Sequence, residues 1–184
     1  AAVAEWLRNL PQLSHESGAA GGWVPDGDAR AELTAGLVVA DGSGMSRENR
    51  LTARHLARVL HAMQHAAQAQ GREPLGEANP ELARAVAMGQ TFLDSLAVAG
   101  ERGTLARRLT DLRGRVVGKT GTLRGVASLS GYLLPPATAS SDSSSNSSSP
   151  AAAGVLTFAI LVESHPVGSA WIDTLVRTLI RAQN

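Results

Sequence analysis

The sequence predicts an α+β protein in which helices flank an antiparallel sheet. Two segments with helical spacing come first, and three segments of strand character follow at residues 115–117, 127–134 and 154–163. An amphipathic segment at residues 169–182 then predicts a closing helix. Three strands make an incomplete sheet for so many helices, so we expect part of the domain to lie outside this chain.

The first half of the chain reads as helices separated by loops. Residues 2–10 predict a helix that stops at Pro11, and residues 12–28 are rich in Gly and Ser and predict a loop. The apolar run at residues 35–40 (AGLVVA) predicts a short buried strand. Thr52 caps a helix that we expect to reach about Gln70. Its predicted inward face is Leu56, Val59, Leu60, Met63 and Ala67.

The second half alternates between helix, turn and strand signals. Asn79 and Pro80 start a helix to about residue 93, Gly100 and Gly103 mark a turn, and residues 104–112 predict a short helix. Residues 118–125 read as a long or bulged hairpin connection, and the Ser-rich residues 135–153 as a flexible insertion loop. Residues predicted to point inward from the last helix are Trp171, Leu175, Val176 and Leu179; Trp6 and Trp23 are also interpreted as packing residues.

The amino-acid composition excludes several kinds of site and gives no support for some kinds of partner. Of the 184 residues, 43% are hydrophobic and 18% charged, which is typical of a folded globular protein. The net charge of +1 gives no electrostatic argument for nucleic acid as a partner. The absence of Cys excludes disulfides, thiolate catalysis and Cys-ligated zinc. Sixteen of the 17 basic residues are Arg, so the single Lys119 stands out.

Lys119 lies in the segment Gly118-Lys119-Thr120-Gly121-Thr122, for which two functional interpretations compete. A phosphate-binding P-loop requires a glycine where Arg113 stands and a helix afterwards, whereas the following residues alternate like a strand. The other interpretation is the K-T-G motif of serine acyltransferases that process D-Ala-D-Ala peptides and β-lactams. An ordinary turn with an exposed lysine is the structural alternative.

The K-T-G interpretation explains the residue types. Lys119 supplies positive charge for a substrate carboxylate, and the Thr120 and Thr122 hydroxyls can hydrogen-bond to it. Gly121 leaves room for a substrate backbone along the strand. A backbone N–H near Thr122 can form half of an oxyanion hole.

A second polar segment, DGSGMSREN, spans residues 41–49 between the predicted strand and a helix. Ser46 and Asn49 are of the types that relay protons and hold an amide. The alternative is a turn in which Ser and Asn side chains satisfy nearby backbone groups.

Three separated segments occur in the order of a known family: DGSGMSREN, FLDSLAVAGERGTLARRL and GKTGTLRGVASLSGYL. They resemble the D-alanyl-D-alanine carboxypeptidase/endopeptidase branch of the low-molecular-mass (class C, dacB-type) penicillin-binding proteins, serine peptidase family S13. The resemblance implies a β-lactamase/transpeptidase-like fold, with residues 1–184 as its C-terminal part. Such proteins use the motifs S-x-x-K, S-x-N and K-T-G, and the first carries the nucleophile. Because the only Lys belongs to K-T-G, the nucleophile must lie outside this chain, on an N-terminal remainder of the same protein.

The resemblance also implies residue roles. Ser46 would relay a proton between the catalytic Lys and the leaving group, while Lys119, Thr120 and Thr122 would bind the terminal carboxylate. The second motif departs from S-x-N, because Glu48 stands two residues after Ser46 and Asn49 three residues after it. The Asn role therefore falls to Asn49, with Glu48 as a competitor for its space.

The implied reaction is acyl transfer through an acyl-enzyme on peptidoglycan D-Ala-D-Ala peptides, without metal or cofactor. β-Lactams would acylate the same nucleophile, the location would be periplasmic or otherwise extracytoplasmic, and the chain alone would be inert. Two further interpretations are a non-catalytic peptidoglycan-binding module and a β-lactamase on the same scaffold. His61 and His65 have a spacing that can bind metal, but we interpret them, like the nearby Arg clusters, as a solvated surface.

Overall fold

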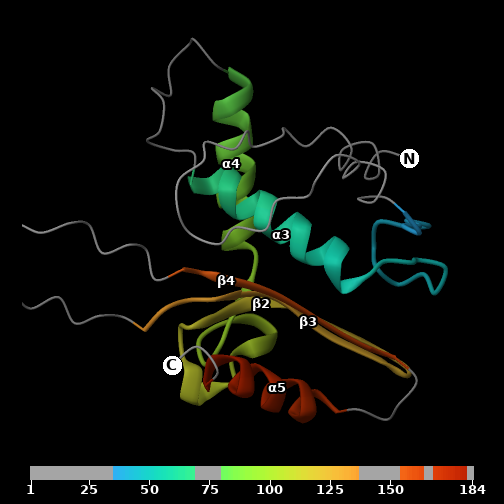
Figure 1. Cartoon of the computed structure of the whole chain (residues 1–184), viewed down its shortest axis with the longest axis vertical. Coiled ribbons are helices and arrows are strands. Elements are labelled where there is room, and N and C mark those ends of the chain that lie inside the picture. Colours follow the sequence, from blue (N-terminus) through green and yellow to red (C-terminus); the bar gives the residue numbers. More distant parts are fainter. Residues whose placement is uncertain (1–34, 69–79, 137–153, 164–167, 182–184) are drawn as a thin grey trace, which may run out of the picture.

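The computed structural model describes residues 35–68, 80–136, 154–163 and 168–181. It has the predicted α+β architecture, with a four-stranded antiparallel sheet in the order β1-β2-β3-β4 and helices on both faces (Figure 1). Helices α3 and α4 lie on one side of the sheet, and α5 lies on the other (Figure 1). The elements are α3 (Ala53–Gln68), α4 (Pro80–Asp94), β1 (Ala97–Val98), the 3₁₀ turns η1 (Gly103–Leu105) and η2 (Thr110–Leu112), β2 (Val116–Leu123), β3 (Val126–Leu133), β4 (Leu156–Glu163) and α5 (Ser169–Arg181).

Strands β2 and β3 form a tight hairpin, which corrects the predicted long connection at residues 118–125. The two strands pair without a bulge from Val116↔Leu133 to Leu123↔Val126, so Arg124 and Gly125 alone make the turn. Gly125 has a φ of +76°, a left-handed conformation that glycine adopts without steric cost. The glycines at 118 and 121 do not interrupt the strand, because both are paired with β3 and lie close against it. The K-T-G segment is therefore part of a regular strand.

The predicted strand at residues 35–40 is wrong. This segment makes one isolated antiparallel bridge, between Val38 and Arg50, and Val38 is 46% exposed. Gly36 has a φ of +72°, which interrupts an extended conformation near the start of the run. The apolar residues alone did not decide the structure here.

The predicted helix at residues 104–112 is also corrected, because two short 3₁₀ turns replace it. Leu109, between them, adopts a φ of +51°, which breaks a right-handed helix. Its side chain is 2% exposed, so burial offsets the local strain. In this region, burial of leucine side chains in the core determines the backbone conformation more than helix propensity does.

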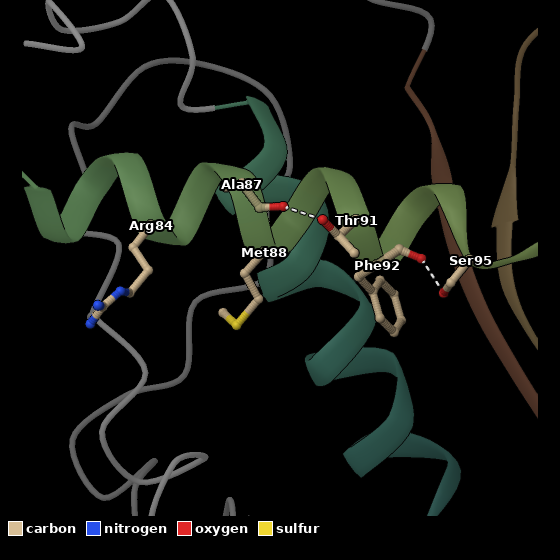
Figure 2. Close-up of a pocket in the computed structure, with 6 residues that line it drawn as sticks. All are labelled: Arg84, Ala87, Met88, Thr91, Phe92 and Ser95. Carbon is tan, nitrogen blue, oxygen red and sulfur yellow. Dashed lines mark hydrogen bonds between the residues drawn. The ribbon is translucent and has the colours of Figure 1, made fainter.

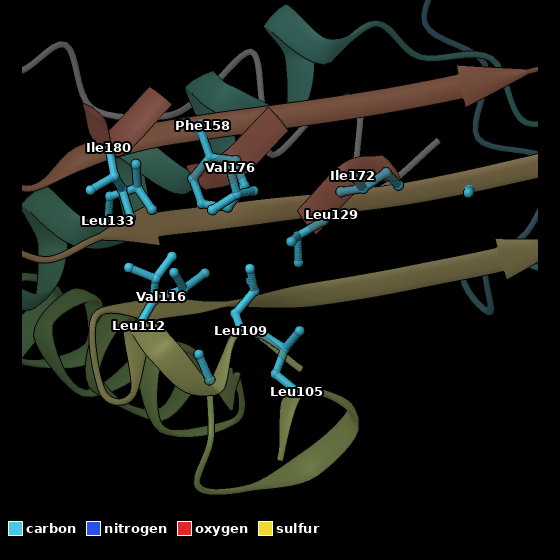
Figure 3. Packing of buried hydrophobic residues seen from close by; sticks show 12 residues of the cluster. Leu105, Leu109, Leu112, Val116, Leu129, Leu133, Phe158, Ile172, Val176 and Ile180 are labelled. Atoms are coloured by element: carbon cyan, nitrogen blue, oxygen red, sulfur yellow. The ribbon is translucent and has the colours of Figure 1, made fainter. Parts of the chain in front are cut away.

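The main core lies between the sheet and α5 (Figure 3). Helix α5 turns Ile172, Val176 and Ile180 toward the sheet, at a spacing of four residues. Trp171 and Leu179, which were predicted to point inward, are 52% and 38% exposed. Val176 is buried as predicted, but its buried neighbours on the helix are Ile172 and Ile180, each one residue further along the chain than Trp171 and Leu179. The buried members are Ala99, Leu105, Leu109, Leu112, Val116, Ala127, Leu129, Leu133, Phe158, Ile172, Val176 and Ile180.

A second apolar cluster joins the other face of the sheet to α3 and the end of α4. Leu60, Leu96 and Tyr132 are its buried members. The Tyr132 hydroxyl donates a 2.6 Å hydrogen bond to the Leu60 carbonyl oxygen, and burial raises the pKa of Tyr132 above its ordinary value. The predicted inward positions Leu60, Met63 and Ala67 are confirmed, while Leu56 and Val59 are half-buried.

Several predictions fall on residues outside the described ranges: the helix at 2–10, the loop at 12–28, Trp6, Trp23, the Asn79 cap and nearly all of the Ser-rich segment. Among the helices that the structure describes, none combines the length and the apolar character needed to cross a bilayer.

Candidate active site

The K-T-G residues lie where β2 loses its neighbour on one side. Strand β1 pairs with β2 at Gly118 and Val117, and no described strand pairs beyond them toward Leu123. The stretch from Lys119 to Leu123 therefore has β3 on one side and an open edge on the other.

The ladder fixes which backbone groups reach this edge. In an antiparallel pair, the N–H and C=O of one residue point to the same side, and successive residues alternate. The Ala99 N–H donates a 2.9 Å hydrogen bond to the Val116 carbonyl, so even-numbered residues of β2 face the β1 side. The N–H and C=O groups of Thr120 and Thr122 therefore point into the open edge, where an extended ligand can bind them.

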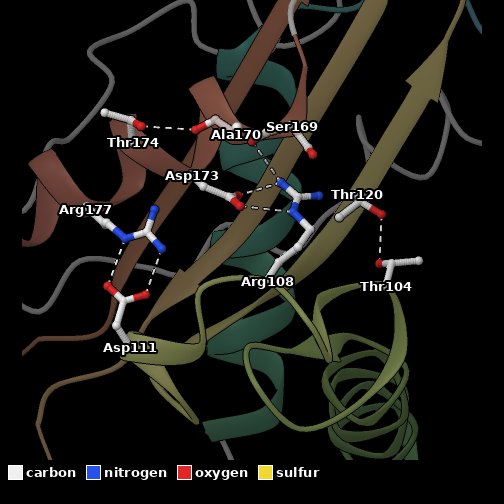
Figure 4. A network of polar contacts seen from close by, with 9 residues as sticks. All are labelled: Thr104, Arg108, Asp111, Thr120, Ser169, Ala170, Asp173, Thr174 and Arg177. Carbon is white, nitrogen blue, oxygen red and sulfur yellow. Dashed lines mark hydrogen bonds and ion pairs between the residues drawn. The ribbon is translucent and has the colours of Figure 1, made fainter.

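Two side chains add polar groups at the same edge. Lys119 is exposed, and its Nζ donates a 2.6 Å hydrogen bond to the Thr120 carbonyl. The Thr120 Oγ1 donates a 2.8 Å hydrogen bond to the Thr104 Oγ1 (Figure 4). Lys119, Thr120 and Thr104 are thus joined by hydrogen bonds, and Thr104 had no role in the sequence-based prediction. Thr122 lies on the same open stretch of β2, two residues after Thr120.

Gly121 has a structural neighbour that the sequence did not reveal. A Cβ at this position would meet the Ser128 hydroxyl, which faces it across the β2–β3 ladder. The missing side chain therefore leaves room for Ser128 on the sheet face, whereas the prediction assigned that room to a substrate.

The segment around Ser46 and Asn49 is a compact loop organised by Asp41. The Asp41 carboxylate accepts hydrogen bonds from the Ser43 Oγ at 2.7 Å, the Asn49 Nδ2 at 2.9 Å, and the backbone N–H groups of Gly44 and Ser46 at 3.2 and 3.1 Å. The hydrogen bonds from Asn49 and then Ser43 hold the pKa of Asp41 below its ordinary value. The alternation of Asp, Gly and Ser in the sequence is the signal that could have identified this turn.

Asn49 and Ser46 both take part in this loop. The Asn49 Oδ1 accepts from the Ala40 and Asp41 N–H groups at 2.8 and 3.2 Å, and the Ser46 Oγ accepts from the Glu48 N–H at 3.2 Å. Most of the Asn49 carboxamide is thus committed to holding the loop closed.

The loop touches the hairpin at its tip. The Arg47 Nη2 donates a 2.9 Å hydrogen bond to the Arg124 carbonyl. Arg124 lies five residues beyond Lys119, about 16 Å along an extended strand. The structure therefore places Ser46 and Asn49 near the far end of the open edge and gives no direct contact between them and Lys119.

Other candidates do not gather into sites. The His61 and His65 rings lie 4.3 Å apart, edge to face, yet within the described residues no three His, Asp or Glu side chains cluster as metal ligands. Helix α4 has a shallow hollow of about 490 Å³ (Figure 2). Its hydroxyls bond to their own helix, Thr91 to the Ala87 carbonyl and Ser95 to the Phe92 carbonyl. Lining residues are Arg84, Ala87, Met88, Thr91, Phe92 and Ser95.

The chain is similar in sequence to known carboxypeptidases. The chain is 36% identical over 139 residues to a D-alanyl-D-alanine carboxypeptidase of Actinomadura sp., covering 72% of this chain and 19% of that protein. It is 35% identical over 153 residues to the carboxypeptidase Rv3627c of Mycobacterium tuberculosis, covering 79% of this chain and 26% of the relative. The carboxypeptidase DacB of Mycolicibacterium smegmatis is 31% identical over the same coverage.

The chain therefore spans about a fifth to a quarter of the length of these curated relatives. Residues 32–74 and 81–181 match the family described as D-Ala-D-Ala carboxypeptidase 3 (S13), a match that includes the Asp41 loop, the Thr104 turn and the K-T-G strand. The chain belongs to the D-Ala-D-Ala carboxypeptidase 3 (S13) family.

Proposed function

We propose that this chain is the C-terminal part of an exported serine D-Ala-D-Ala carboxypeptidase/endopeptidase that acts on peptidoglycan stem peptides in the periplasmic or extracytoplasmic cell-wall space. The observation that carries the proposal is the open edge of β2. The Lys119 ammonium, the Thr120 hydroxyl and the outward backbone N–H groups of Thr120 and Thr122 lie along this edge.

These groups match a peptide that ends in a free carboxylate. The Lys119 ammonium and the hydroxyls of Thr120 and Thr122 would bind the terminal carboxylate by charge-assisted hydrogen bonds. The peptide backbone would lie along the edge as an added strand. The outward Thr122 N–H would donate to the oxyanion that forms on the penultimate D-Ala carbonyl.

The reaction would proceed in two acyl transfers. A serine Oγ attacks the penultimate D-Ala carbonyl carbon, the peptide C–N bond breaks, and the terminal D-Ala leaves with the serine proton on its amine. Water then attacks the ester carbonyl and releases the shortened peptide and the serine. An endopeptidase reaction would break a cross-link by the same steps.

The nucleophile belongs to the remainder of the protein. Its partner base in S-x-x-K is a lysine, and the one lysine of this chain is committed to the open edge. The chain alone would therefore neither acylate nor hydrolyse. Ser46 as a proton relay and Asn49 as a substrate ligand stay predictions, to be tested by Ser46→Ala and Asn49→Ala in the full-length protein.

A labelled penicillin tests the proposal directly. We expect full-length protein to form a covalent adduct, because β-lactams carry the carboxylate and the reactive carbonyl that the edge would bind. Lys119→Ala should slow acylation by at least about tenfold, since a hydrogen-bonded charge is worth about 1.5–3 kcal/mol. Lys119→Arg keeps the charge but changes its geometry, and we expect it to recover only part of the rate.

The outcomes separate the alternatives. No adduct together with retained peptidoglycan binding would indicate the non-catalytic module. An adduct that hydrolyses at the turnover rate of a β-lactamase would indicate that enzyme class. Normal acylation of Lys119→Ala would overturn the carboxylate role of Lys119.

A further inference from the structure

Thr104 lies against the open edge of β2, on a segment sixteen residues before Thr120. The hydrogen bond between the two Oγ1 atoms, at 2.8 Å, is the contact that joins them (Figure 4). Both hydroxyls are accessible, since Thr104 is exposed and Thr120 half-buried. We propose that Thr104 is a positioning residue that orients the Thr120 hydroxyl toward a substrate carboxylate, an inference that rests on the proposed function.

The backbone around Thr104 is fixed on both sides. Gly103 has a φ of +65°, and a Cβ there would lie 2.9 Å from the Ala97 Cβ, so the turn packs closely against β1. Leu105 is fully buried in the main core, and its carbonyl accepts a 3.0 Å hydrogen bond from the Gly100 N–H. Thr104 therefore has little freedom to move away from β2.

The residues after the turn are held by α5. The Arg108 Nη2 lies 2.6 Å from the Asp173 Oδ1, and its Nε donates to Oδ2 at 3.3 Å (Figure 4). Both side chains are largely shielded, at 21% and 12% exposure, so water screens this pair less than an exposed one. A second pair joins Arg177 to Asp111. The segment that carries Thr104 is thus clamped between β1 and α5.

The hydroxyl pair has a defined chemistry. Each hydroxyl has one hydrogen and can both donate and accept, so two bonded hydroxyls use one hydrogen between them and keep one for a ligand. In this structure Thr120 donates its hydrogen to Thr104. When Thr104 rotates its hydroxyl and donates to Thr120 instead, the Thr120 hydrogen is free for a carboxylate to accept, and the bond between the two oxygens still fixes the Thr120 rotamer. Without the Thr104 oxygen, the Thr120 hydroxyl can rotate freely. Ordering it when substrate binds then makes the free energy of binding less favourable.

The test compares three variants of the full-length protein on matched substrates. Thr104→Val removes the hydroxyl at nearly constant shape, and Thr104→Ser restores it. Thr178→Val is the control, because the Thr178 hydroxyl bonds to the Thr174 carbonyl of its own helix, α5. The substrates are a stem peptide that ends in D-Ala-D-Ala with a free carboxylate and the same peptide as its C-terminal amide, with wild-type turnover of the first as the reference.

We expect Thr104→Val to lower kcat/KM on the free-carboxylate peptide by about five- to tenfold, the effect of losing about one hydrogen bond. The loss should appear mainly in KM, with at most about a twofold change on the amide peptide, and Thr104→Ser should recover most of it. Unchanged kinetics in Thr104→Val would overturn the proposal, as would an equal loss on both peptides that Thr104→Ser does not rescue. If wild-type protein processes neither peptide and binds no penicillin covalently, the proposed function itself fails.

Discussion

At the scale of single residues, Thr120 connects the parts of the candidate site. Its carbonyl accepts from the Lys119 ammonium, its hydroxyl bonds to Thr104, and its N–H points into the open edge. One residue thus brings a charge, a hydroxyl and a backbone donor to the same place. A substrate carboxylate that replaces the Thr120 carbonyl as the partner of Lys119 would keep the ammonium hydrogen-bonded throughout.

Gly121 permits a specific prediction because a side-chain atom occupies its Cβ position. Gly121→Ala should destabilise the fold by about 1–3 kcal/mol, the usual effect of inserting a methyl group into a packed position. The double variant Gly121→Ala/Ser128→Ala should recover more than half of this loss, because the competing atom is the Ser128 hydroxyl. Urea unfolding at constant m-value measures both effects.

Gly131 provides the control for that experiment. A Cβ at Gly131 would meet the Val117 carbonyl, a backbone atom that no side-chain change can remove. Gly131→Ala should therefore stay destabilised in the Ser128→Ala background. Strictly additive effects for Gly121→Ala and Ser128→Ala would contradict the steric explanation.

The motif made Lys119, Thr120 and Thr122 predictable because adjacency along one strand is enough to place them. Thr104 was not predictable, since a hydrogen bond across sixteen residues depends on how β1 and the main core fold the chain back. Asp41 shows the reverse case, in which a local Asp, Gly and Ser pattern contained the information. Its carboxylate and Asn49 together show that a polar residue near a candidate site can serve the loop itself.

At the scale of elements, the start of α3 combines a predicted cap with an unexpected partner. The Thr52 Oγ1 accepts from the His55 N–H at 3.2 Å, and the His55 Nδ1 accepts from the Thr52 N–H at 3.1 Å. This reciprocal pair is the arrangement that Glu or Gln usually completes at the same position. Since Nδ1 must be unprotonated to accept, the cap requires neutral His55.

This cap predicts a pH-dependent stability. Burial, and secondly the positive charge of Arg58, lower the pKa of His55 from its ordinary value of 6.5. Between the folded-state pKa and 6.5, the unfolded chain binds more protons, so stability falls with falling pH. The contribution is fully present above pH 6.5 and is lost as the pH drops through the folded-state pKa.

Thermal unfolding from about pH 7.5 to about pH 5.5 measures the effect, since the histidine titrates within this range. His55→Gln keeps an acceptor that does not titrate, so we expect a smaller decrease of Tm toward acid than in wild type. Thr52→Ala, as a control, should lose about 1 kcal/mol at every pH. Identical pH slopes for wild type and His55→Gln would contradict the role of His55.

For helix α5, the sequence predicted the residue range of the helix but not which of its faces is buried. Trp171, Leu175 and Leu179 form one apolar stripe, while Ile172, Val176 and Ile180 form another beside it. The second stripe is the one packed in the main core, and the same rotation of the helix lets Asp173 reach Arg108. Periodicity identifies a helix, but two adjacent apolar stripes leave its rotation to tertiary contacts.

At the scale of the whole molecule, the sheet has two different edges. On one side, the short β1 leaves half of β2 open, and the polar groups of the candidate site gather there. On the other side, β4 is paired with β3 along its full length and has no further strand beside it in the described part of the chain. A long unpaired edge readily pairs with another strand.

The ladder identifies which β4 groups are open. Even-numbered β3 residues face β2, so odd-numbered ones face β4, and their partners Phe158, Ile160 and Val162 direct their N–H groups back to β3. The N–H groups of Thr157, Ala159 and Leu161 therefore point outward. Because the relatives are about three to four times as long as this chain, we propose that a strand from the remainder of the protein pairs with them.

Hydrogen exchange of the isolated chain and of the full-length protein tests this pairing. In the isolated chain, we expect fast exchange at Ala159 and Leu161 beside slow exchange at Ile160 and Val162, with all four slow in the full-length protein. Ala159→Pro removes an outward N–H, so it should leave the isolated fold nearly unchanged while weakening the full-length protein. Ile160→Pro removes a bond to β3 and should destabilise both. Equally fast exchange at Ala159 in both proteins would show that β4 is a true edge and would overturn the proposed pairing.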